Sequence, residues 1–137
     1  MNKHLLLAGG LLCLLILGRL PAAGMDRWAA LSLLESGDND AAVGRAGEVS
    51  RFQIKPGLWE QYGPPGPAAA RTNPRAALRV ARAIMNSRCG EFKRRFHRPP
   101  TDFEYYVLWN APAQIQKPGR VVAERATRFR NLVASDL

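Results

Sequence analysis

The chain has no apolar run long enough to cross a lipid bilayer. The run Leu5–Gly18 has 14 residues, whereas a membrane-spanning helix needs roughly 20. It follows a basic start at Lys3 and precedes small residues at positions 22–24, which is the pattern of a secretory signal peptide. We therefore expect residues 1–24 to be a cleaved signal peptide, with an N-terminal membrane anchor as the alternative, and residues 25–137 to form one exported domain.

Cysteine and histidine are also scarce, with two residues of each among 137. Removal of residues 1–24 leaves Cys89 alone, so no disulfide is expected within the mature chain. It also leaves His97 without a second histidine or a cysteine that would complete a metal site. We therefore expect no metal and no cofactor, and a core that is held by packing and includes Cys89 as a small apolar residue.

Acidic residues are outnumbered, with 11 of them against 20 lysines and arginines, which gives a net charge of +9. A basic surface on an exported protein attracts polyanions, whether nucleic acid, anionic lipid or the acidic polymers of a cell wall. The basic run Lys93–Arg98 fits such a patch, but it is interpreted first as a solvated loop face. Charge alone therefore indicates an anionic partner without choosing its class.

Most of the chain carries helix signals. Asp26 can cap a first helix, which Gly37 ends. A second helix begins with Asn73 and Pro74 and is predicted to stop near Gly90. The other signals are a helical turn from Pro56, a capping box at Thr101–Glu104 before a helix that ends ahead of Pro112, and a last helix from about Pro118 with Val122, Ala126, Phe129 and Leu132 on one face.

The segments between these helices have no helical period. Residues 38–48 are rich in Gly, Asp and Ala and are predicted to form a loop, and the Pro-rich segment 63–67 is predicted to be a surface connection. Residues 49–54 alternate apolar with polar side chains, which is typical of a short strand or extended segment. The predicted fold is therefore mainly α, with one short extended or β element near residues 47–54.

Glu35 occupies an unfavourable position for a charged carboxylate. It lies in the last turn of the first predicted helix, where unpaired carbonyls carry partial negative charge, and its neighbours Leu31 and Leu34 are apolar. Both effects oppose ionisation, so we expect a raised pKa. A carboxylic acid that stays protonated near neutral pH can act as a general acid. The alternative, without a catalytic role, is a solvent-facing glutamate at a helix end.

Three blocks of sequence accompany this glutamate: Glu-Ser and the loop after it at 35–44, a Gln-Ile-Lys-Pro block within 47–56, and Leu-Trp-Asn-Ala-Pro at 108–112. In this order they resemble the motifs of the lytic transglycosylases of the goose-type-lysozyme-like superfamily, which act on bacterial peptidoglycan. The second block departs from the family's Gly-Leu at Ser50-Arg51. The third departs at Trp109, where the family has tyrosine, and at Pro112, where it has glycine. The resemblance covers most of 26–132 and implies a lysozyme-like helical domain.

Carried over residue by residue, the resemblance implies that Glu35 is both acid and base. It would protonate the leaving oxygen between MurNAc and GlcNAc, then take the proton of the muramic C6 hydroxyl, which gives a 1,6-anhydro end. The implied protein is a monomer of the periplasm, the cell envelope or the medium, and its partner is the glycan strand rather than nucleic acid. The implied substrate-binding residues are Ser36, Gln53, Trp109 and Asn110, with Tyr106 or Tyr105 replacing the family's tyrosine.

The residues leave alternatives open. Ordinary glycosidases use two carboxylates, and Glu48 or Asp38 could be the second one in a lysozyme-like hydrolase. Otherwise Asp38 and Asp40 are expected to shape the turn through hydrogen bonds to the backbone, and Glu48 to lie on the surface or pair with Arg51. The departures from the motifs favour a non-catalytic wall-binding module on the same fold, and the charge by itself favours a polyanion-binding protein.

Overall fold

A computed structural model of the chain describes residues 24–66 and 71–134. The expected signal peptide or anchor lies outside the described residues, apart from Gly24. Within the described ranges the chain forms five α-helices, together with the 3-10 helix η2 (Pro112–Gln114) and isolated bridges in place of strands. The predicted mainly-α fold is therefore confirmed. None of the helices in these ranges is long and apolar enough to cross a membrane.

Helix α1 (Arg27–Ser36) has the ends that its sequence predicts. The Asp26 carboxylate accepts hydrogen bonds from the backbone amides of Trp28 at 2.8 Å and Ala29 at 3.2 Å. Gly37 ends the helix in the left-handed conformation, with φ of 66°, which glycine adopts without a steric penalty. Glu35 therefore lies in the last turn of α1, as expected.

Helix α3 (Pro74–Phe96) is longer than predicted. It starts as expected, with the Asn73 side chain accepting from the amide of Ala76 at 3.0 Å, but it continues through Gly90 and ends at Phe96, with His97 as its C-cap. A glycine inside a helix costs only about 1 kcal/mol. Burial of Phe92, which is 3% exposed, contributes more than that, so the helix does not stop at the glycine.

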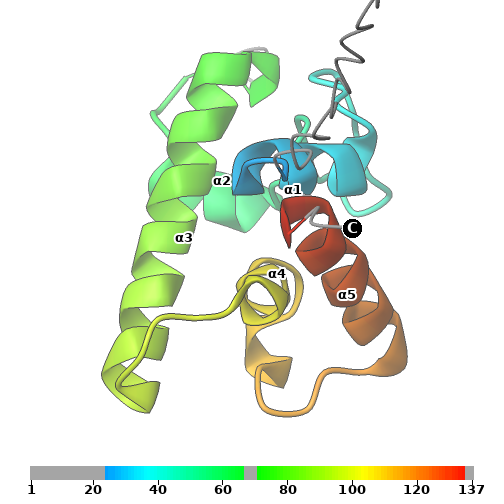
Figure 1. Cartoon of the computed structure of the whole chain (residues 1–137). Helices are drawn as coiled ribbons and strands as arrows, with labels where there is room; N and C mark the ends of the chain where they lie inside the picture. Colours follow the sequence, from blue (N-terminus) through cyan, green and yellow to red (C-terminus); the bar gives the residue numbers. More distant parts are fainter. Residues whose placement is uncertain (1–23, 67–70, 135–137) are drawn as a thin grey trace, which may run out of the picture.

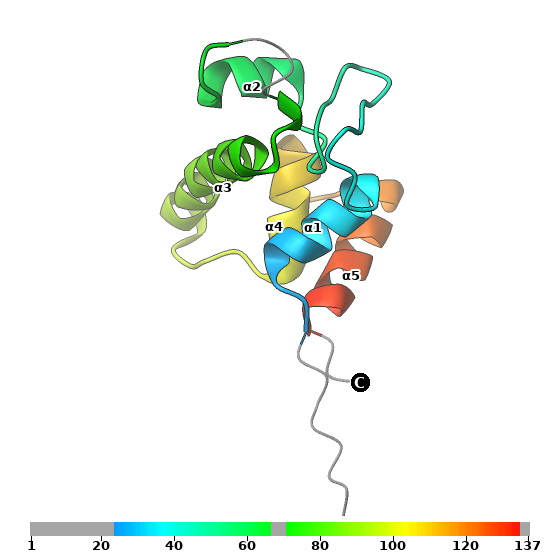
Figure 2. The same ribbon diagram turned by 90° about the horizontal axis from the view of Figure 1, so that it is seen from above.

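Helix α4 (Asp102–Asn110) is the central element and lies between α3 and α5 in both views (Figure 1, Figure 2). Its predicted capping box is present, and the five consecutive residues 105–109 are buried. Helix α5 (Arg120–Ala134) begins two residues after the expected Pro118 and packs against α4 and α1. Its Phe129 ring lies 5.9 Å from Tyr105 and 5.6 Å from Tyr106, measured between ring centroids.

The predicted extended element between α1 and α2 (Pro56–Tyr62) takes the form of isolated antiparallel bridges, Val43 with Val49 and Val49 with Ile54. Val49 and Ile54 exchange backbone hydrogen bonds of 3.0 and 2.9 Å, so the segment turns back on itself instead of running straight. Ser50 and Gln53 have positive φ angles, 71° and 50°, which reverse the chain within four residues. Apolar alternation alone does not reveal such a reversal.

Candidate active site

A cavity of about 520 Å³ opens where α1, α3, α4 and α5 meet the loop before α2. Each of these elements contributes a polar side chain that lies far from the others in sequence. The lining residues that carry the argument are Glu35, Glu48, Gln53, Trp109, Asn110 and Arg125. Five of the expected site residues are therefore brought to one cavity, together with Arg125, which was not expected.

Glu35 is almost enclosed at this cavity, with its side chain 9% exposed. Its Oε1 accepts a hydrogen bond of 2.6 Å from the Tyr106 hydroxyl and one of 3.1 Å from Nη2 of Arg125. Burial raises the pKa of Glu35, these two donors oppose the rise, and the negative charge of Glu48 adds to it. The predicted direction is therefore found, but its first cause is burial rather than the carbonyls of the helix end.

Tyr106 presents a phenolic hydroxyl to Glu35, a group that Trp109 cannot supply. Its side chain is fully buried on α4, and burial together with the charge of Glu35 raises the pKa of Tyr106, so the hydroxyl stays protonated and donates. Tyr105 was the alternative, but one residue along a helix turns the side chain by about 100°. Tyr105 consequently packs among Trp28 and Phe129, and Tyr106 is the tyrosine that reaches Glu35.

Arg125 was missed by sequence reasoning. Its Nη2 bonds both Oε1 of Glu35 and the backbone carbonyl of Leu34, the latter at 2.9 Å. The available signal was its position next to Ala126 in the apolar face of α5, which places it at the edge of the buried surface. The sequence did not indicate that this edge meets the end of α1, 90 positions earlier.

Glu48 and Gln53 line the cavity from the loop. The Glu48 carboxylate accepts from the amide of Ala46 at 3.0 Å, and the Gln53 amide donates to the carbonyl of Ser50 at 3.0 Å. Both side chains lie over Gly44: a Cβ atom there would collide with the Glu48 carboxylate and lie 2.7 Å from Oε1 of Gln53. Glycine at position 44 therefore leaves space for two polar groups of the cavity.

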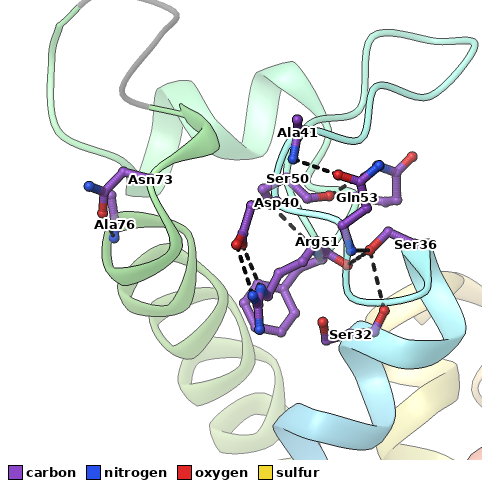
Figure 3. Close-up of polar contacts among 11 residues, drawn as sticks. Ser32, Ser36, Asp40, Ala41, Ser50, Arg51, Gln53, Asn73 and Ala76 are labelled. Carbon is purple, nitrogen blue, oxygen red and sulfur yellow. Dashed lines mark hydrogen bonds and ion pairs between the residues drawn. The ribbon is translucent and has the colours of Figure 1, made fainter.

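Ser36 stabilises this loop, and it is absent from the cavity wall. Its hydroxyl donates to the carbonyl of Arg51 at 2.8 Å and accepts from the amide of Asn39 at 3.0 Å, as Figure 3 shows for the serine and arginine. Through these contacts the end of α1 supports the turn that carries Gln53, and the role of Ser36 in binding substrate stays a prediction.

The acidic residues of the loop are used differently from the prediction. Asp40 accepts two hydrogen bonds from Arg51, of 2.6 and 2.8 Å (Figure 3), and Arg51 holds the pKa of that carboxyl below its usual range. The Asn39 side chain, between the two aspartates, accepts a hydrogen bond from the backbone amide of Ala41. Of the two alternatives for Glu48 outside catalysis, a surface position or a pair with Arg51, the pair with Arg51 is therefore wrong. Asp38 and Asp40 lie outside the cavity wall.

The end of α4 forms another wall of the cavity. Trp109 is 7% exposed, with its ring edge-on to Phe52 at 6.5 Å between centroids, and Asn110 is the last helical residue. Nη1 of Arg88 donates to the carbonyls of Leu108 and Trp109, both at 2.8 Å. A cation at the carbonyl end of a helix is favourable, so Arg88 stabilises the end of α4 from α3.

The charges around the cavity favour an anionic ligand. Four basic side chains line it, against the carboxyls of Glu35 and Glu48; the four are Arg45, Lys55, Arg88 and Arg125. In the described part of the chain, no group of three or more His, Cys, Asp and Glu side chains is placed to hold a metal ion. The cavity thus combines one buried acid with an electropositive wall. Comparison with protein-family models, with curated proteins and with solved structures finds no match.

Proposed function

We propose that this protein is an exported lytic transglycosylase of peptidoglycan, with a lysozyme-like helical domain, and that Glu35 is its acid and base. The observation that carries the proposal is the Glu35 carboxyl, which lies largely enclosed at the wall of a cavity of about 520 Å³ and is bonded by Tyr106 and Arg125. The blocks around Glu35, Gln53 and Asn110, which resemble the family's motifs, support it. Their side chains line the same cavity although they are far apart in sequence.

The reaction needs one carboxyl. Neutral Glu35 gives its proton to the glycosidic oxygen as the bond from that oxygen to C1 of the muramic residue breaks, and the bonding electrons leave with the oxygen. The resulting Glu35 carboxylate then takes the proton of the C6 hydroxyl. At the same time the oxygen of that hydroxyl forms a bond to C1. Glu35 returns to its neutral form, no water is consumed, and the product has a 1,6-anhydro ring.

The remaining cavity residues would bind the sugar chain. Gln53 and Asn110 present amides that can bond hydroxyl and acetamido groups, and the aromatic side chain of Trp109 lines the same cavity. The basic residues of the cavity would attract the carboxylates of the muramic residues and their peptides. The proposed partner is therefore a glycan strand of the cell envelope, bound by a monomer.

A lysozyme-like hydrolase is the second candidate, because Glu48 lines the same cavity as Glu35 and its charge raises the pKa of Glu35. The two carboxyls therefore interact electrostatically, as the pair in a glycosidase does. Asp38, the other expected partner, has no such position. In this version Glu48 would stabilise or activate the attacking group, and water would give an ordinary reducing end.

Digestion of purified sacculi with the purified protein, followed by mass spectrometry of the soluble products, tests the proposal. We expect anhydro-muropeptides from the wild type, a loss of roughly 100-fold or more in Glu35→Gln, and full activity in Glu60→Gln, a matched change at an exposed position of α2. Glu48→Gln should stay active as a transglycosylase. Reducing ends that disappear in Glu48→Gln would favour the hydrolase, and binding to sacculi without product would favour the wall-binding module.

A further inference from the structure

The two hydrogen bonds to the Glu35 carboxyl end on the same oxygen atom. The Tyr106 hydroxyl lies 2.6 Å from Oε1, and Nη2 of Arg125 lies 3.1 Å from it. Among the residues that the structure describes, none donates a hydrogen bond to Oε2 of Glu35. The carboxyl therefore has one oxygen, Oε1, that is held by two protein donors and one, Oε2, that receives no hydrogen bond from the described residues.

Both of these groups are donors to Glu35. Arginine has no acceptor, and burial raises the pKa of Tyr106, so its hydroxyl keeps its proton. Oε1 thus accepts two hydrogen bonds, which uses both lone pairs of a carbonyl oxygen. A proton on Oε2 leaves both bonds intact, whereas a proton on Oε1 would have to replace one of them, so the arrangement favours Oε2 as the protonated oxygen of neutral Glu35.

We propose that Arg125 is a positioning residue, which together with Tyr106 holds Oε1 and makes Oε2 the atom that gives up and takes back the proton. This inference rests on the proposed function. The Oε2–H bond breaks as the leaving oxygen takes the proton, and the negative charge left on the carboxylate lies against the guanidinium. Oε2 then accepts the proton of the C6 hydroxyl, which restores the starting state.

The guanidinium is fixed in place, as this role requires. Nη2 of Arg125 also bonds the carbonyl of Leu34 at 2.9 Å, and the guanidinium carbon lies 5.8 Å from the centroid of the Tyr106 ring. Arg125 is thus bound to the backbone of α1 and to the face of α4 at once. These contacts place the guanidinium beside Oε1 of Glu35.

Other charged groups also face Glu35, so the effect of Arg125 has to be separated from theirs. From the loop, Glu48 opposes ionisation of Glu35, whereas Arg125 and Tyr106 favour it. Further cations line the cavity without a hydrogen bond to Glu35, and these are Arg45, Lys55 and Arg88. Arg125 is the cation that bonds Oε1, so its substitution changes the bonding of that atom as well as the charge nearby.

Infrared difference spectroscopy of the full chain across the titration of Glu35 tests the assignment directly. The C=O stretch of the neutral carboxyl is identified by its shift with ¹³C-labelled glutamate and by its loss in Glu35→Gln. Because a hydrogen bond to a carbonyl oxygen lowers its stretching frequency, we expect the band to move to higher frequency in Arg125→Met and in Tyr106→Phe. In Arg125→Lys, which keeps a cationic donor, the band should lie between those of the wild type and Arg125→Met. Arg128→Met, an equal loss of charge at an exposed position of α5, should leave the band in place.

Two further readouts accompany the spectrum. We expect Arg125→Met to raise the pKa of Glu35, as measured by ¹³C NMR of the carboxyl carbon. The same variant should lower kcat on sacculi roughly 10- to 100-fold, with a smaller change in KM. A band that stays in place in both Arg125→Met and Tyr106→Phe would overturn the assignment of Oε2. If Arg125→Met does not fold, Tyr106→Phe alone decides. These spectra need no turnover, so a wild type that gives no anhydro-muropeptides refutes the proposed function and leaves the position of the proton to be judged separately.

Discussion

Glu104 joins the start of α4, the helix that carries Tyr106 and Asn110, to the turn before it. Its carboxylate accepts hydrogen bonds of 2.9 Å from both the amide and the hydroxyl of Thr101. It also pairs through both oxygens with Arg98, at 2.6 and 2.8 Å. Arg98 first, and Thr101 after it, lower the pKa of Glu104 from 4.5 to about 2. Replacement of Glu104 is therefore expected to destabilise α4.

The magnitude follows from the two kinds of contact. Loss of a helix cap costs about 1 kcal/mol. The side chains of Arg98 and Glu104 are 49% and 20% exposed, and a solvent-screened pair of this kind contributes about 0.2–1 kcal/mol. We expect Glu104→Ala to lower the free energy of unfolding at pH 7 by about 1–2 kcal/mol, or the Tm by roughly 4 °C per kcal/mol. Glu104→Gln, which keeps an acceptor for the cap, should lose about half as much.

The pH dependence separates the charge from the cap. A carboxyl whose pKa is lowered in the folded state stabilises the protein above its unfolded value, near 4.5, and this contribution is lost as the pH falls toward about 2. The difference between the wild type and Glu104→Gln should therefore shrink between pH 4.5 and pH 3. Urea unfolding followed by circular dichroism, with the exposed Glu60→Gln as control, measures it. Equal stability at pH 7, or a difference at pH 3 as large as at pH 7, would refute the reasoning.

Three further predictions concern the cavity and its supports. Gly44→Ala should displace Glu48 and Gln53, because its Cβ would lie 2.7 Å from Oε1 of Gln53; we expect weaker binding to sacculi with an unchanged circular dichroism spectrum, and unchanged binding would contradict this. Glu35→Gln should raise the Tm at pH 7. Burial raises the pKa of Glu35, so ionisation of this carboxyl destabilises the folded state above about pH 4.5. A gain in Tm that persists at pH 4 would argue against this cause. Phe129→Ala, at a fully buried position, should cost about 3–5 kcal/mol in urea unfolding, and a loss below 1 kcal/mol would show that α5 does not depend on this ring.

Local signals in the sequence were sufficient to predict where α1, α3 and α4 begin and which face of α5 is apolar. Asp26, Asn73 and the Thr101–Glu104 box each act on amides no more than three residues away, so the chemistry of a short segment determines them. The ends were less predictable. Gly90 did not stop α3, because the packing of Phe92 outweighs the helix propensity of one glycine.

The candidate site divides in the same way. The sequence by itself determined that Glu35 lies at the end of an apolar helix, and it predicted a shared site for Glu35, Gln53 and Asn110. Only the tertiary structure decided that Tyr106 rather than Tyr105 reaches Glu35, and that Arg125 bonds the same oxygen. These contacts join residues 71 and 90 positions apart, and they depend on how α4 and α5 pack against α1, which no local pattern of residues encodes.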